Sequence, residues 1–161
     1  MDIETPQPKK NDEEMRNIIE EARVILPGLQ AVFGFQTAAV FSERFTDLKT
    51  YAEACHLIGL ALIVVAMAML MTPAVYYRAR HGDATRRMLT ISRKAIRGAL
   101  VPMSIGFSLD MLTVMSLATD ALAISIAAAI VTLAMFVGLW YIIPKKDPEP
   151  AGDVRDESRV T

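Results

Sequence analysis

The sequence predicts an all-α membrane protein whose four transmembrane helices form an up-down bundle. Its composition is typical of a membrane protein, because 53% of the 161 residues are hydrophobic, 22% are charged and the mean hydropathy is +0.33. The hydrophobic residues lie in long unbroken runs, whereas a soluble domain would spread them with the period of a helix or strand. Lysine and arginine are concentrated in alternate connecting segments, which is the pattern that orients membrane helices.

Four runs of the chain have the length of a membrane span. A hydrocarbon core of about 30 Å requires about 20 helical residues. Each of the four runs (24–42, 54–77, 98–119 and 121–144) meets that length, and the third is the only one that contains a charged residue. We therefore expect transmembrane helices at about 22–42, 55–77, 98–118 and 121–143.

The last two runs are nearly continuous, so the chain needs a turn between them. As a single helix they would be about 70 Å long, which is more than twice the thickness of the bilayer core. The most polar place for a turn is Thr119-Asp120. We expect a tight hairpin at this point, and we expect Asp120 to cap the exposed N–H groups of the following helix.

The distribution of positive charge predicts which side of the membrane each end occupies. Fifteen lysines and arginines precede the first run, separate the second from the third, or follow the fourth. Only Arg44 and Lys49 lie between the first and second runs, and none lies in the final turn. By the positive-inside rule, both termini are expected in the cytoplasm. Aromatic residues fall at the predicted inner interface, where they are favoured: Tyr76, Tyr77, Trp140 and Tyr141.

The chain is expected to form a single transmembrane domain over residues 12–144. Residues 1–11 and the tail, 145–161, are proline-containing and poor in apolar side chains, so both are predicted to be disordered cytoplasmic segments. Helical periodicity predicts juxtamembrane amphipathic helices at about 12–22 and 84–97, each leading into a span. The acidic, polar N-terminal segment predicts no cleavable signal peptide.

Basic side chains recur on the predicted helix 84–97. They are candidate contacts for anionic lipid headgroups, for which each cation contributes about 1 kcal/mol. The alternative interpretation is that they only enforce the membrane topology. The candidates are Arg86, Arg87, Arg93, Lys94 and Arg97.

Asp110 is the strongest candidate for a functional residue, because it is the only charged residue within the four runs. An ionised carboxylate at the centre of a bilayer costs about 2.5–3.5 kcal/mol on insertion scales, so this side chain should face the bundle interior. It is either a protonatable group on an ion path or a protonated carboxyl that bonds a neighbouring helix. The polar residues expected around it are Gln30, Gln36 and Thr113.

Several classes of function are not expected. A single cysteine, Cys55, excludes a disulfide framework and a cysteine-based zinc site. His56 is expected to be solvated near the outer end of the second span, and no metal-ligand spacing or nucleophile–base pair is visible, so we expect no cofactor and no enzymatic activity. A net charge of -1 argues against nucleic acid as a partner.

The sequence resembles an uncharacterised family of small four-span bacterial integral membrane proteins. The resemblance covers residues 20–145 and is carried by the segment EEARVILPGLQAVFGFQTAAVFSERF, by HLIGLALIVVAMAMLMTPAVYYR and by GLWYIIPK. Some members of that family are labelled automatically as sodium:proton antiporters. The resemblance implies a multi-pass protein of the bacterial plasma (inner) membrane, and it transfers no catalytic or ligand-binding residue.

Two functional hypotheses follow from these features. The first is a structural or accessory membrane protein that acts by helix–helix association, either with itself as a homo-oligomer or with a membrane protein partner in the lipid bilayer. The second is an oligomeric proton or sodium pathway, similar to an antiporter, that uses the intramembrane Asp110. An oligomer is required for the second, because four helices leave little room for a gated cavity.

Overall fold

The computed structural model describes residues 7–143, and over this range the chain is helical and contains no strand. This confirms the predicted all-α class. The four long helices are α1 (Gln7–Val40), α2 (Thr50–Ala79), α3 (Arg86–Thr119) and α4 (Leu122–Val137). A 3₁₀ helix, η1 (Glu43–Asp47), connects α1 to α2, and a π-helical turn, η2 (Gly138–Ile142), extends α4.

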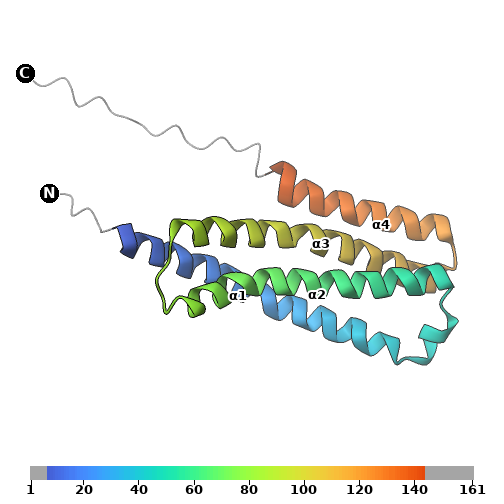
Figure 1. Cartoon of the computed structure of the whole chain (residues 1–161). Helices are drawn as coiled ribbons and strands as arrows, with labels where there is room; N and C mark the ends of the chain where they lie inside the picture. Colours follow the sequence, from blue (N-terminus) through green and yellow to red (C-terminus); the bar gives the residue numbers. More distant parts are fainter. Residues whose placement is uncertain (1–6, 144–161) are drawn as a thin grey trace, which may run out of the picture.

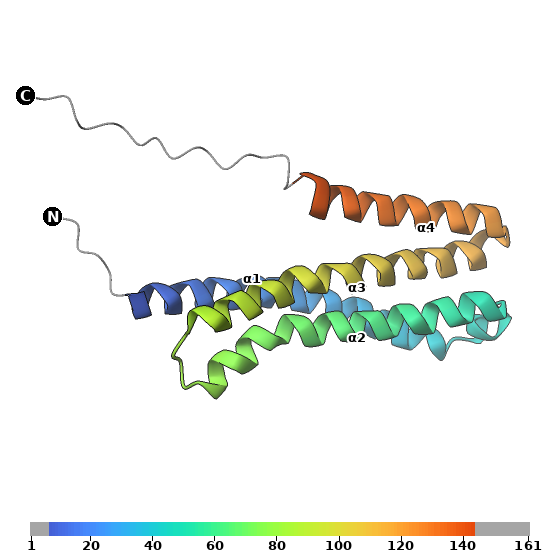
Figure 2. The same ribbon diagram turned by 45° about the horizontal axis from the view of Figure 1, so that its top comes forward.

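Successive helices run in opposite directions, so α1 begins and η2 ends at the same end of the bundle (Figures 1 and 2). We call this the terminal end, and we call the opposite end, which holds η1 and the α3–α4 turn, the hairpin end. Among residues 7–143, three helical segments are long and apolar enough to cross a membrane, namely α2, α3 and Leu122–Ile142. Helix α1 is not among them, because its apolar half carries Gln30 and Gln36 as well as Pro27.

Helices α1 and α3 are longer than the expected spans because each absorbs its amphipathic segment. Both have 34 residues, which corresponds to about 51 Å of helix. The segments predicted at 12–22 and 84–97 are therefore the first turns of α1 and α3. Helix α1 already begins at Gln7, inside the segment 1–11 that was expected to be disordered, whereas the tail 145–161 lies outside the described residues.

The extra turns of α1 and α3 pack together at the terminal end. Met15 and Ile18 of α1 and Met88 and Leu89 of α3 are buried and belong to the hydrophobic core. Above this contact, Glu14 forms an ion pair with Arg93, and the carboxylate of Asp12 accepts a hydrogen bond from the backbone N–H of Ala84 at 2.9 Å. The amphipathic segments therefore bury their apolar faces against each other.

The centre of the bundle is the contact between α2 and α3. Helix α2 buries a stripe that recurs every three or four residues, which is the spacing of a helix seam. The stripe consists of Ala52, His56, Gly59, Ile63, Ala66, Leu70 and Pro73. It packs against α3 around Ala99 and Met103, so the middle of this contact is apolar.

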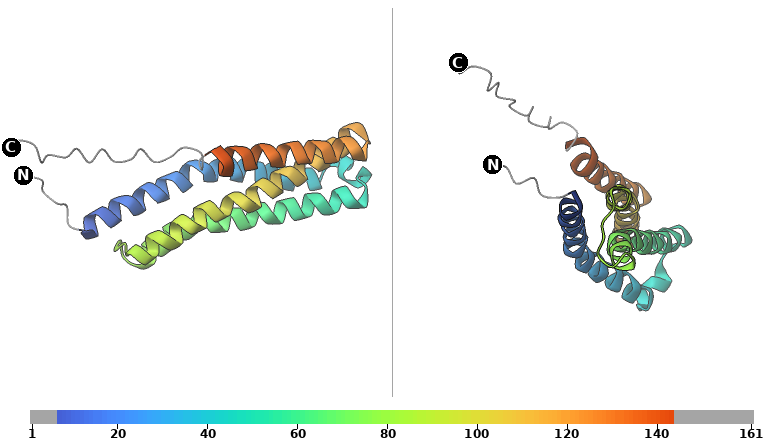
Figure 3. Two further views of the ribbon diagram at one scale, coloured as in Figure 1. Left: turned by 90° about the horizontal axis from the view of Figure 1, so that it is seen from above. Right: turned by 60° about the vertical axis from the view of Figure 1, so that its left-hand side comes forward.

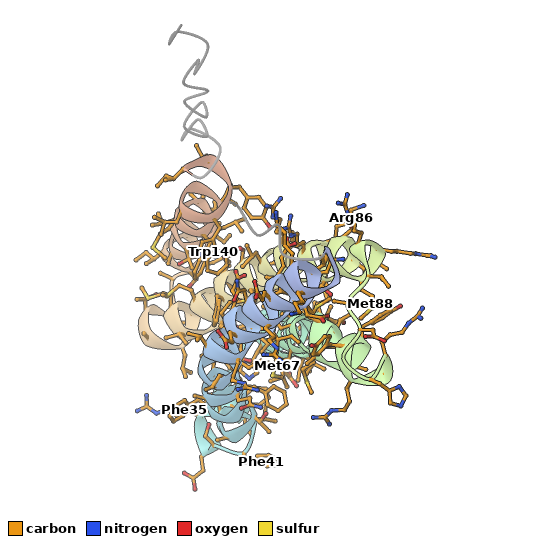
Figure 4. All side chains as sticks on the ribbon, turned by 90° about the vertical axis from the view of Figure 1, so that its left-hand side faces the viewer. Phe35, Phe41, Met67, Arg86, Met88 and Trp140 are labelled. Atoms are coloured by element: carbon orange, nitrogen blue, oxygen red, sulfur yellow. The ribbon has the colours of Figure 1, made fainter. Side chains whose placement is uncertain are left out.

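Helix α4 stands at the side of the bundle and packs against α3 (Figure 3). Ser125 is its buried residue. Phe107 of α3 stacks on Phe136 of α4, which in turn contacts Trp140 at a ring-centroid distance of 4.6 Å. Figure 4, viewed from the terminal end, shows α4 with Trp140 standing apart from α1. Most of the surface of α4 is therefore free to contact lipid or another helix.

The predicted hairpin at Thr119-Asp120 is confirmed, but the expected cap is wrong. Asp120 adopts a left-handed conformation with φ 50°, and no side chain caps α4. Its carboxylate instead lies 2.6 Å from the ammonium group of Lys49, which precedes α2. This ion pair lowers the pKa of Asp120 and raises that of Lys49, and it links the two turns of the hairpin end.

Candidate functional site

Asp110 lies inside the bundle, on the face of α3 that meets α2 and α1. The side-chain amide of Gln36, from α1, donates a hydrogen bond to Oδ2 of Asp110. Gln36 is 7% exposed and the side chain of Asp110 is 16% exposed, so this contact is partly shielded from the surroundings. The structure therefore brings together two of the polar residues expected from the sequence.

His56 of α2 completes the cluster, although the sequence analysis expected it to be solvated. Its side chain is only 6% exposed. Nε2 lies 3.0 Å from the backbone carbonyl oxygen of Gln36, and Nδ1 lies 3.6 Å from Oδ1 of Asp110. One side chain or backbone group from each of three helices therefore converges on this point, which we call the Asp110 cluster (Asp110, His56 and Gln36).

The geometry of the imidazole ring determines how many protons the cluster holds. A carbonyl oxygen only accepts hydrogen bonds, so Nε2 of His56 carries a proton and donates it to Gln36. A deprotonated Nδ1 facing an ionised Asp110 would place a lone pair against a negative charge. A second proton, on either Nδ1 or Oδ1, would remove this repulsion and leave the Asp110–His56 pair neutral overall.

Two glycines allow the carboxylate to lie between closely packed helices. A Cβ atom added to Gly59 would lie 3.0 Å from Oδ1 of Asp110 and 3.2 Å from the carbonyl oxygen of Gly106. A Cβ atom on Gly106 would lie 3.2 Å from the carbonyl oxygen of Gly59. Any larger residue at either position would therefore push α2 and α3 apart at the level of the cluster.

Two oxygen atoms of the cluster are left without a hydrogen-bond partner in the described part of the chain, Oδ1 of Asp110 and Oε1 of Gln36. Oδ1 faces Nδ1 of His56 at a distance slightly longer than a hydrogen bond. A small approach of the His56 ring and the Asp110 carboxyl group would convert this contact into a hydrogen bond. The cluster therefore keeps two acceptor oxygens, one on Asp110 and one on Gln36, that could bind a further donor.

A series of polar contacts continues from the cluster to the hairpin end. The hydroxyl of Thr113 lies 3.1 Å from the carbonyl oxygen of Ala52, and the hydroxyl groups of Tyr51 and Ser116 are 2.9 Å apart. Beyond Ser116 lies a cavity of about 420 Å³ that is also lined by Lys49 and Asp120. The cluster therefore lies at the inner end of a polar zone that starts at the hairpin end.

On the other side of the cluster the interior becomes apolar. Ile63, Ala66 and Leu70 of α2 and Ala99 of α3 are each 0% exposed. Met103 closes the same layer at 5%. We call these five residues the apolar layer, and they separate the Asp110 cluster from the terminal end.

Two of the residues expected beside Asp110 are placed elsewhere. Gln30 is exposed and lines a groove between α1 and α2, so it is not part of the Asp110 cluster. Thr113 is buried one turn after Asp110, but its hydroxyl contacts the carbonyl oxygens of Ala52 and Leu109 instead of the carboxylate. His56 was not expected in the site, although its helical spacing from Ala52 and Gly59 placed all three residues on one face of α2.

The comparison with known proteins gives a family but no function. Residues 4–144 match the family described as "Family of unknown function (DUF6328)". The chain belongs to this family. No curated protein and no solved structure was found to match it.

The basic residues proposed to meet lipid headgroups are all exposed on the first turns of α3. They are Arg86, Arg87, Arg93, Lys94 and Arg97. Arg93 pairs with Glu14 of α1, so the positive charge of Arg93 is balanced by a residue of the same chain. Within residues 7–143, no three histidine, cysteine or acidic side chains come together in a group that could hold a metal ion.

Proposed function

We propose that this DUF6328 protein is a four-span integral protein of the bacterial plasma membrane with both termini in the cytoplasm. Three of its helices have the length and hydropathy of spans. Helix α1 supplies the fourth, because it carries no formal charge after Arg23 and its buried Gln36 is bonded to Asp110. The positive charges that flank the helices are concentrated at the terminal end, which supports a cytoplasmic position for that end.

We further propose that the protein is not an enzyme and acts as a structural or accessory membrane protein through helix–helix association, with a second copy or with another membrane protein. The apolar layer is the observation that carries this proposal. It fills the contact between α2 and α3 in the described part of the chain, and the Asp110 cluster joins three helices of a single copy to each other. Such an interior suits a rigid scaffold.

The surface of α1 offers a place for the association. Gly34 is exposed, and a Cβ atom added to it would meet no other atom within 4 Å. Ala38 lies one turn away on the same face and is also exposed. Small residues at this spacing allow the backbones of two membrane helices to approach closely.

We expect Gly34→Leu to weaken the association, because the larger side chain would keep a neighbouring helix at a distance. The measurement is the molecular mass of the protein, in mild detergent and after cross-linking in native membranes. Gly28→Leu is the matched control, because Gly28 is an equally open glycine on a different face of α1. A wild-type chain that is strictly monomeric and cross-links to no other membrane protein would contradict the proposal.

A second candidate function, a proton or sodium pathway, is favoured by one observation. Nδ1 of His56 faces Oδ1 of Asp110 at 3.6 Å in the interior, and polar side chains lie between this pair and the hairpin end. For transport, the apolar layer would have to open, or an oligomer would have to provide the second half of the path. Helix–helix association is therefore required by the first candidate function and by the oligomeric form of the second.

We expect a pathway of this kind to give proton or sodium flux in proteoliposomes that is lost in Asp110→Asn and reduced in His56→Gln. Both substitutions keep a polar side chain of similar size, but Asn cannot exchange a proton. The measurement is the change in fluorescence of an internal pH dye after an ion gradient is applied. Gln30→Leu is the control, since Gln30 lies outside the cluster. Flux no higher than that of empty liposomes would reject this candidate.

A further inference from the structure

A groove between α1 and α2 remains unexplained by either candidate function. It opens on the side of the bundle near the terminal end and has a volume of about 730 Å³. This lies in the range of about 300–1,000 Å³ that is typical of ligand sites. Most of its lining is apolar, including Leu26 and Pro27 of α1 and Leu70, Met71 and Val75 of α2.

The mouth of the groove is basic. An adjoining cavity of about 270 Å³ shares Arg23, Arg78 and Ala74 with the groove and adds Arg16. The carboxylate of Glu20 is the acidic group in that lining. Three arginines and one glutamate leave the mouth with a net charge of +2.

The arginines at the mouth are available to a ligand. Arg16, Arg23 and Arg78 are exposed, and none of them forms an ion pair with a carboxylate of the described residues. By contrast, Arg93 at the same end of the bundle is held by Glu14. A guanidinium group recognises a phosphate group through a planar set of N–H donors, so unpaired arginines around a cavity indicate an anion site.

We propose that this groove binds one anionic glycerophospholipid, with the phosphate group at Arg16, Arg23 and Arg78 and an acyl chain in the trough beside Leu70 and Met71. Charge complementarity is the first argument, because an anionic headgroup balances the net charge of the mouth. The shape of the groove is the second argument. Its charged mouth leads into its apolar trough, as the charged headgroup of a lipid leads into its acyl chains. Basic pockets between membrane helices on the cytoplasmic side are known to hold anionic lipids.

The depth of the groove favours a lipid over a soluble protein as its occupant. Met71 lies eight residues before the end of α2 at Ala79, which corresponds to about 12 Å along the helix. In the membrane placement proposed above, on which this inference rests, the trough is therefore at the level of the acyl chains. The mouth lies at the level of the headgroups, where Arg side chains can extend.

The test is a titration of the purified full chain in neutral detergent with phosphatidylglycerol, followed by native mass spectrometry. Phosphatidylcholine, which has the same chains and no net charge, is the comparison lipid. We expect a bound phosphatidylglycerol and at least fivefold weaker binding of phosphatidylcholine. The double variant Arg23→Gln/Arg78→Gln should weaken phosphatidylglycerol binding about 25-fold, or about fivefold per arginine.

Two matched controls separate the groove from general attraction to a basic surface. Arg44→Gln/Arg80→Gln removes the same amount of charge from exposed arginines that line neither part of the groove, so its binding should equal that of the wild type. Ala74→Phe fills the groove without changing its charge and should also abolish binding, whereas Ala61→Phe, on an exposed part of α2 outside the groove, should not. Equal losses in a variant and its control would overturn the proposal.

A free phosphate ion is distinguished from a lipid by competition. Inorganic phosphate at millimolar concentration should not displace phosphatidylglycerol, because it lacks the chain that occupies the trough. Displacement by phosphate, together with full binding to Ala74→Phe, would overturn the lipid assignment. Equal binding of the two lipids would do the same while leaving the membrane placement intact, whereas a chain that stays dissolved without detergent would contradict the placement itself.

Discussion

Replacement of Asp110 by leucine is expected to lower the free energy of unfolding by about 3 kcal/mol. The substitution removes the acceptor of the Gln36 hydrogen bond and the partner of Nδ1 of His56. Each buried polar group that is left unpaired costs about 1–3 kcal/mol, with values toward the lower end between membrane helices. The measurement is reversible unfolding in mixed micelles, followed by circular dichroism.

Asp110→Asn is the variant that distinguishes a shared proton from an ordinary charge. Its amide oxygen can accept from Gln36, and its NH₂ group can donate to Nδ1 of His56, as a protonated carboxyl would. We therefore expect it to lose less than about 1 kcal/mol, because the hydrogen bonds of the neutral pair are preserved. A loss as large as that of Asp110→Leu would show that the interior requires an ionised carboxylate facing a protonated imidazole, instead of a protonated carboxyl group facing a neutral one.

The second large effect is expected at Gly59, where α2 and α3 are closest. Gly59→Ala should cost about 1–3 kcal/mol, because its Cβ atom would meet the Asp110 carboxylate and the backbone of Gly106. Gly59→Leu should cost more than this and should separate Asp110 from His56. The thermal unfolding of each variant in detergent gives the comparison.

Gly28 provides the control for these substitutions. Nothing lies within 4 Å of the position of its Cβ atom, so Gly28→Ala and Gly28→Leu change helix propensity and little else. They should unfold at or above the temperature of the wild type. If Gly59→Leu were as stable as Gly28→Leu, the close approach of α2 and α3 would not be needed for the fold.

Much of the architecture could be predicted because it depends on local properties of the chain. Long apolar runs produced helices, and the turn at Thr119-Asp120 lies where the length argument placed it. Orientation in the membrane and the role of α1 as a fourth span stay predictions. Helix ends were less accurate, since α2 begins at Thr50 and α1 at Gln7. Hydropathy marks where a chain can enter lipid, whereas a helix ends where its backbone hydrogen bonds end.

The composition of the site was harder to predict because it depends on how each helix is rotated. Gln30 and Gln36 are six residues apart, which places them on different faces of α1, so only one of them could meet Asp110. Both were expected beside Asp110 because both are polar. Similarly, Asp120 was expected to cap the helix that follows it, but its partner, Lys49, comes from a turn 71 positions earlier.

The order in which the three cluster helices occur along the chain has a consequence for biosynthesis. Gln36 and His56 both precede Asp110, so a ribosome completes α1 and α2 before α3 leaves the insertion channel. In the proposed membrane placement, the carboxyl group would enter lipid with its bonding partners already in place. A protein with the reverse order would have to hold a solitary acid among hydrocarbon chains until the later helices arrived.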